Sequence, residues 1–134
     1  MTKRSRASLG LAHGLRLLGR ALLVRCPNCG SGGIFASWFR LEERCPKCGL
    51  HLERGEHDHF LGAMMFNIVV AEAVFVIGFV VILLATWPSP PWTLLEYGGV
   101  IAMILAPIVL YPLSRTIWLA FDLALRPPTP DELG

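Results

Sequence analysis

The sequence predicts a small four-cysteine zinc ribbon built on a β-hairpin, preceded by an amphipathic helix and followed by an all-α hairpin of two transmembrane helices. Three observations support this fold class. All four cysteines lie in two C-P-x-C-G units, at residues 26–30 and 45–49. Long apolar runs follow Phe60, in a chain whose apolar fraction is 54%. Ten of the twelve Lys and Arg precede Phe60, so a basic half is joined to a nearly uncharged half.

Residues 1–24 form a basic, amphipathic lead-in. Arg16 and Arg20 lie among leucines that recur at steps of four and three, which is helical periodicity. Because these arginines interrupt the apolar segment, a cleavable signal peptide is not expected. Two compatible interpretations stay open: a helix lying on an anionic membrane leaflet, or a short helix packed on the ribbon or on the membrane hairpin. The leucines are Leu11, Leu15, Leu18 and Leu22.

Residues 25–57 form the predicted zinc ribbon. Two cysteines separated by two residues supply a pair of thiolates from one tight turn, and zinc prefers four such ligands in a tetrahedron. Gly30 and Gly49 follow the second cysteine of each pair and suit turns with positive φ. The aromatic run 34–41 and residues 50–52 are the expected hairpin arms. The predicted zinc ligands are Cys26, Cys29, Cys45 and Cys48.

Other chemistry stays open for these thiols. The C-P-x-C unit also resembles a redox dithiol, and four thiolates can hold an iron–sulfur centre or another metal. Two matched units, each followed by glycine, favour zinc. A closed site with four thiolates has no open coordination position, so we expect a structural rather than a catalytic metal.

The polar junction at residues 53–59 contains a candidate second metal site, formed by Glu56, His57 and His59. Residues one or two apart do not share a helix face, which argues against a site on a helix. The alternative is a polar junction in which Asp58 caps the helix that follows.

Residues 58–125 form the predicted transmembrane hairpin, with spans at about 60–87 and 93–121. Each run exceeds the ~20 residues that cross a bilayer. The Pro-rich link at 88–91 cannot continue a helix, and it contains no Lys or Arg. The positive-inside bias therefore predicts that both termini are cytoplasmic, in a bacterial inner membrane. Residues 126–134 form a Pro-rich tail, of which the segment 126–130 is expected to be extended and exposed.

Small residues recur every seven positions on the first span and every four on the second. They are expected to close the hairpin, with a partner subunit as the alternative contact. Three polar residues stand out within the spans: Asn67, Glu72 and Arg115. An ionisable group inside the membrane is costly unless it is paired, so Glu72 and Arg115 are expected to approach each other. The small residues are Ala71, Gly78, Ala85, Gly98, Ala102 and Ala106.

This layout resembles a family of small bacterial membrane proteins, domain of unknown function 983. The resemblance rests on residues 26–30, 33–35, 45–50 and 55–56, and it covers about 25–125. Family members often continue the junction as Gly-Asp-Gly-Pro, whereas this chain has Gly-Glu-His-Asp at 55–58. The resemblance implies an inner-membrane protein with an accessory or assembly role near respiratory oxidases, and it supplies no activity.

The sequence favours a non-catalytic membrane protein whose cytoplasmic zinc ribbon contacts another membrane protein through Trp38 and Phe39. The alternatives are copper or thiol redox handling, and nucleic-acid binding by the ribbon. Nucleic acid is disfavoured because the bases of the ribbon are interleaved with Glu42 and Glu43. An enzyme is not expected, since no nucleophile–base pair, phosphate loop or paired carboxylates are found, and no small-molecule substrate is evident.

Overall fold

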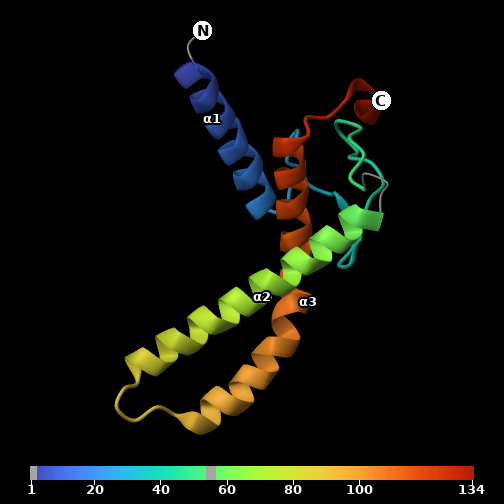
Figure 1. The fold of residues 1–134 in the computed structure, drawn as a ribbon. Coiled ribbons are helices and arrows are strands. Elements are labelled where there is room, and N and C mark those ends of the chain that lie inside the picture. Colours follow the sequence, from blue (N-terminus) through green and yellow to red (C-terminus); the bar gives the residue numbers. More distant parts are fainter. Residues whose placement is uncertain (1–2, 54–56) are drawn as a thin grey trace.

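The computed structural model describes the backbone of residues 3–53 and 57–134, and the side chains of 10–53 and 60–134. Helix α1 spans Lys3–Leu22, and helices α2 (His57–Ala85) and α3 (Trp92–Leu125) form a hairpin. Strands β1 (Phe35–Ser37) and β2 (Arg40–Leu41) lie between α1 and α2, and a short helix, α4 (Pro130–Leu133), ends the chain. Both termini lie at the end of the molecule opposite the link between α2 and α3 (Figure 1).

The four-cysteine ribbon contains two small hairpins. Strands β1 and β2 pair antiparallel, with Phe35 opposite Leu41. The predicted aromatic run therefore folds back on itself and supplies both arms. The second predicted arm, 50–52, instead belongs to a hairpin around the second cysteine pair. In this hairpin Arg44 and His51 form an antiparallel β-bridge, and the Leu52 N–H donates to the Glu43 carbonyl at 3.0 Å.

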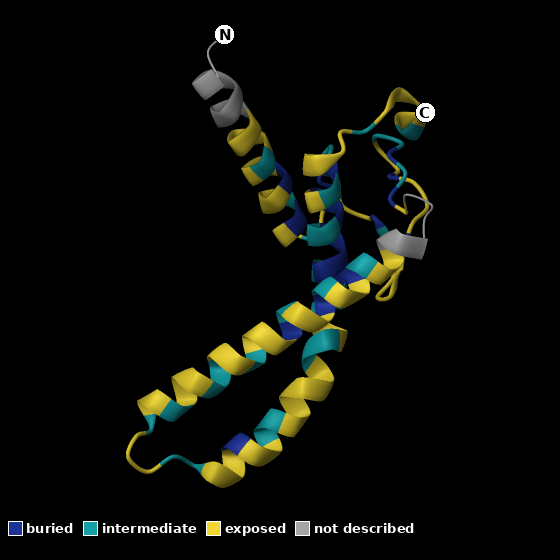
Figure 2. Ribbon diagram, in the orientation of Figure 1, coloured by how far each residue is buried: buried dark blue, intermediate teal, exposed yellow. Residues whose placement is uncertain are grey.

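One hydrophobic core joins the ribbon to α1 and to the last turns of α3. Figure 2 shows the buried residues gathered there, while most of α2 and the first part of α3 are exposed. The fully buried Thr116 hydroxyl of α3 donates to the Ala21 carbonyl at the end of α1, at 2.8 Å, and the same carbonyl accepts the Val24 N–H at 2.9 Å. The core residues are Leu17, Ala21, Cys26, Ile34, Leu41, Cys45, Leu50, Leu52, Leu119, Ala120 and Leu123.

The helix hairpin is joined most closely near its ribbon end. Asn67 of α2 donates its amide to the Pro107 carbonyl at 3.0 Å and accepts the Ser114 hydroxyl at 2.9 Å. A Cβ on Gly62 would overlap the Trp118 ring, so this glycine allows the two helices to meet. Polar contacts and one close glycine therefore hold the helices together here.

The small residues do not close the half of the hairpin far from the ribbon, so the prediction is wrong there, although Ala71 is buried. A Cβ on Gly78 would have no neighbour within 4 Å, and Ala102 is exposed. A groove of about 260 Å³ lies between the helices, lined by Gly78, Gly98, Ala102 and Ala106 among others. The Phe75 ring lies against Gly99. If Gly99 had a Cβ atom, that atom would be 3.3 Å from the ring. This ring holds the backbones apart, so the small residues line a groove.

The turn of the first ribbon hairpin docks on α3 where two prolines interrupt the helix. Pro112 has no N–H, so it cannot bond to the carbonyl of Ile108, four residues earlier. The Trp38 indole N–H donates to that carbonyl at 2.8 Å. The Phe39 ring packs on Tyr111, with centroids 5.2 Å apart. The two aromatics are still half exposed, but they fasten the ribbon to the hairpin, which the sequence analysis did not foresee.

Within the part of the chain that the structure describes, two helices are long and apolar enough to cross a membrane, over Phe60–Ala85 and Trp92–Leu125. Their mean hydropathies are 3.0 and 1.9, and only 6% of the most apolar window of each is buried. Core helices of water-soluble proteins bury such residues, because large exposed apolar patches are rare on soluble monomers. The exposure therefore distinguishes these helices from the core helices of a soluble domain.

Candidate metal centre

The two cysteine pairs fold into matching turns. In each turn the N–H of the first cysteine donates to the carbonyl five residues later, at 2.9 Å in both. The glycine N–H donates back to the carbonyl of the first cysteine, at 2.7 Å in the first turn and 3.0 Å in the second. Gly30 and Gly49 have φ of 78° and 72°, a left-handed conformation that glycine adopts without steric cost. The repeated C-P-x-C-G sequence thus builds two equivalent ligand pairs.

The four sulfurs converge on one point. The sulfurs of Cys26, Cys29, Cys45 and Cys48 all lie within 4.8 Å of one another. The Cys26–Cys48 separation is 3.8 Å and the Cys29–Cys45 separation is 3.6 Å. A tetrahedral ion with metal–sulfur bonds of ~2.3 Å needs sulfurs ~3.8 Å apart. The arrangement therefore fits a four-thiolate metal site.

Ser31 supplies a polar contact to this cluster that the sequence analysis missed. Its hydroxyl lies 3.0 Å from the Cys29 sulfur and 3.2 Å from the Cys45 sulfur. A hydroxyl hydrogen bond to a thiolate offsets negative charge and fixes the ligand in place. The only sequence signal is an asymmetry: Ser31 follows the first glycine, whereas Leu50 occupies the matching place in the second turn.

Replacing Ser31 by alanine is expected to weaken metal binding about 10-fold, the lower end of the effect of outer-shell ligand contacts. The four sulfurs stay in place, so the metal stoichiometry should not change. Competition with a chromophoric chelator measures the affinity, and Ser37→Ala, on the exposed strand β1, is the matched control. Equal affinities in the two variants would contradict a role for the Ser31 hydroxyl.

The thiols differ in their readiness to ionise. Burial alone raises the pKa of Cys45, but hydrogen bonds from the Ser31 hydroxyl and from the backbone of Cys48 and Lys47 outweigh it and lower the pKa to about 6. Burial dominates at Cys26, whose pKa is well above the usual value, and it also raises the pKa of Cys48. The apo site at neutral pH therefore holds a mixture of thiolate and thiol.

Metal affinity is expected to increase with pH because metal ligation needs thiolates. Burial raises the pKa of Cys26 and of Cys48, so both still carry protons near pH 7, whereas Cys45, with a pKa of about 6, has mostly lost its proton. Binding should therefore release about two to three protons, and the logarithm of the affinity should rise by about two to three per pH unit. Chelator competition between about pH 6 and 8 measures this slope. A slope near four, or no slope, would be inconsistent with the unequal pKa values.

Arg20 of α1 holds the first cysteine turn. Its guanidinium donates to the Asn28 carbonyl at 2.6 Å and to the Pro27 carbonyl at 3.2 Å, and its side chain covers Gly30. A divalent ion with four thiolates carries a net charge of −2, which a nearby cation stabilises. The arginine assigned from sequence to the polar edge of an amphipathic helix thus supports the metal site.

The C-terminal tail is extended and mostly exposed over residues 126–129, in agreement with the prediction, but its end covers the second cysteine turn. The His51 N–H donates to the Glu132 carbonyl at 3.1 Å, and the Leu133 carbonyl lies 2.6 Å from where a Cβ on Gly49 would be. A capping box formed by Thr129 and Glu132 starts α4 and turns the chain back. Pro130 begins this helix, where the fixed φ of proline matches the helical conformation.

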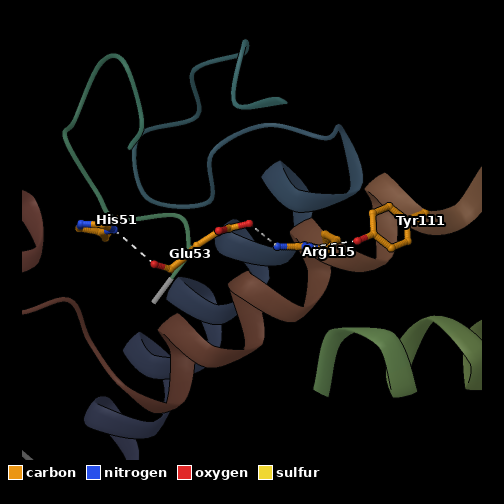
Figure 3. A network of polar contacts seen from close by, with 4 residues as sticks. All are labelled: His51, Glu53, Tyr111 and Arg115. Carbon is orange, nitrogen blue, oxygen red and sulfur yellow. Dashed lines mark hydrogen bonds and ion pairs between the residues drawn. The ribbon is translucent and has the colours of Figure 1, made fainter. Parts of the chain in front are cut away.

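Arg115 pairs with Glu53 of the ribbon, so the predicted approach to Glu72 is wrong. Its guanidinium donates to Glu53 Oε1 and to the Tyr111 hydroxyl, at 3.0 Å each (Figure 3). Glu72 is exposed. The contacts of Asn67 with Pro107 and Ser114 set the register between α2 and α3. With this register, Arg115 lies on the ribbon side of the point where the two helices meet. The third intramembrane residue, Asn67, is buried at that crossing.

The candidate second metal site lies outside the described side chains. Glu56 is outside the described backbone, and the side chains of His57, Asp58 and His59 are not described. Among the described residues, the metal-ligand cluster consists of the four cysteines alone.

Comparison with known proteins supports the family resemblance. Residues 35–122 match the family described as a protein of unknown function, DUF983. The matched range includes the second cysteine pair and both long apolar helices, and it begins after the first pair. No curated protein and no solved structure matched the chain. Because the match covers more than half of the 134 residues, the chain belongs to the DUF983 family of proteins of unknown function.

Proposed function

We propose that this chain is a non-catalytic integral membrane protein whose cytoplasmic zinc ribbon is an accessory or assembly module for a membrane complex. The observation that carries this proposal is the convergence of four cysteine sulfurs in a site built into the same core as the end of α3. Such a site stabilises a rigid head on top of a membrane hairpin.

Zinc is the metal that this ligand set favours. Four thiolates in tetrahedral array are typical of structural zinc sites, and they leave no position for a substrate or water. Cys26 and Cys45 are almost fully buried, with 0% and 2% of their surface exposed. The exposed apolar helices support insertion in a bilayer, and the basic residues near the ribbon support a cytoplasmic head.

A contact with another membrane protein is supported by the outward side of the ribbon turn. Trp38 and Phe39 keep 53% and 55% of their surface exposed although their inner sides dock on α3. Aromatic side chains that are held in place on one side lose little entropy on binding and are common at interfaces. Because Ile108 lies within the apolar helix, the partner is expected to be a membrane protein. The family resemblance suggests a respiratory complex.

The test is purification of the full chain from native membranes in mild detergent, with metal analysis and mass spectrometry of bound proteins. We expect one zinc per chain and a stoichiometric partner that is lost in Trp38→Ala/Phe39→Ala, while the zinc remains. Val100→Ala, an exposed apolar change far from the ribbon, is the control. Copper in place of zinc, or thiols that cycle to a disulfide, would favour metal or redox handling. Salt-dependent binding of DNA or RNA would favour the nucleic-acid alternative.

A further inference from the structure

The leucine face of α1 does not contact the rest of the described protein core. Leu17 and Ala21, with 3% and 0% exposure, are the α1 residues in that core. The leucines that recur at steps of four and three point elsewhere and stay exposed: Leu11 67%, Leu15 60%, Leu18 39% and Leu22 54%. Exposing four leucines on one helix face to water costs hydrophobic free energy, so we expect this face to contact another apolar surface.

An apolar groove of about 390 Å³ lies beside this face. Gly14 and Leu18 of α1 form one side, Phe66 of α2 another, and Ile117, Trp118 and Phe121 of α3 much of the remainder. Every residue that lines it is apolar, and its volume lies in the range of ligand sites. The groove has the chemistry of a site for a hydrocarbon chain.

The groove reaches the long apolar helix α2, which supplies Phe66 to its lining. The neighbouring residue Met65 is 57% exposed on the same helix. In Figure 1, α1 lies across the direction of α2 and beside the last turns of α3, at the ribbon end of the hairpin. The α1 segment has five Lys and Arg and no acidic residue. Arg20 is engaged at the first cysteine turn, and the other four basic residues complement an anionic leaflet.

We propose that α1 and this groove bind a phospholipid of the cytoplasmic leaflet, an inference that rests on the proposed membrane location. One acyl chain lies in the groove beside Leu18, Phe66 and Trp118, and the leucine face lies on the leaflet around it. A lipid is favoured over a protein occupant because the lining of the groove is almost entirely apolar and because one side of it belongs to the exposed apolar helix α2.

The test uses Trp118, which lines the groove, as the fluorophore. The full-length chain carries Trp38→Phe, Trp87→Phe and Trp92→Phe, so that Trp118 is the remaining tryptophan. It is reconstituted, with its metal, in vesicles of phosphatidylglycerol and phosphatidylcholine whose acyl chains are brominated at mid-chain. Bromine quenches indole fluorescence on contact. Gly14→Leu fills the groove, and Gly19→Leu is the control, since a Cβ at either glycine has no neighbour within 4 Å.

We expect strong quenching of Trp118 that falls about twofold in Gly14→Leu and does not change in Gly19→Leu, since leucine would occupy ligand space. Equal quenching in all three proteins would show contact with bulk lipid alone and would overturn the proposal. Quenching that increases as the protein is diluted in the bilayer would assign the groove to a second copy. Extraction of the unsubstituted chain from vesicles by alkaline carbonate would instead refute the membrane location, and an unsubstituted chain without zinc would refute the proposed metal.

Discussion

Replacing Cys45 and Cys48 together by serine is expected to abolish stoichiometric metal binding and to unfold the ribbon. Apart from the metal ligands Cys26 and Cys45, the ribbon contributes four buried side chains to the core, namely Ile34, Leu41, Leu50 and Leu52. Structural zinc sites supply roughly 10–16 kcal/mol of apparent binding free energy, and small metal domains fold only with their metal. Losing two of four thiolates removes most of this free energy.

Metal analysis and hydrogen exchange of residues 26–52 measure this outcome. We expect amide protection in the ribbon to be lost, while the apolar part of α2 stays protected because lipid or detergent covers it. Ser37→Ala, an exposed change in the same ribbon, should keep both metal and protection. A double serine variant whose ribbon remains protected would show that the hydrophobic core folds the ribbon by itself.

The second prediction concerns the asymmetric ion pair between Arg115 and Glu53. Only 6% of the Arg115 side chain is exposed, against 51% of the Glu53 side chain. Glu53→Ala leaves a buried guanidinium without its carboxylate, which costs 3–5 kcal/mol in a fully buried pair. Because water reaches Glu53, we expect a smaller loss, about 1–2 kcal/mol of unfolding free energy. Arg115→Met leaves a carboxylate that water can solvate, so its cost should be smaller, below about 1 kcal/mol.

Equilibrium unfolding in detergent, followed by fluorescence, measures both variants and the double variant. The double variant should be as stable as Arg115→Met alone, since neither charge remains buried without a partner. Glu42→Ala, which removes an acid of the ribbon that is not paired with Arg115, is the control. A larger loss for Arg115→Met than for Glu53→Ala would mean that the packing of Arg115 on Phe60 and Tyr111 outweighs its charge.

Local sequence patterns predicted the structure correctly where interactions between residues close in sequence determine it. The two C-P-x-C-G units predicted two ligand pairs because each turn is stabilised by hydrogen bonds within six residues. The apolar runs predicted long helices, since a helix satisfies its own backbone groups. The patterns failed where residues distant in sequence meet. Nothing near Arg115 identifies Glu53 as its partner, and the tail gives no local sign that Leu133 returns to Gly49.

The sequence by itself determined that four thiolates converge and that two apolar helices follow a basic segment, because ligand spacing and hydrophobic length are local properties. Only the tertiary structure decided how these parts are joined. Pro112 leaves the Ile108 carbonyl open for Trp38, Arg20 holds the first cysteine turn, and Thr116 joins α3 to α1. These contacts depend on the register between helices, which packing sets and no single segment specifies. The same packing leaves the leucines of α1 facing outward, where we expect them to meet the membrane.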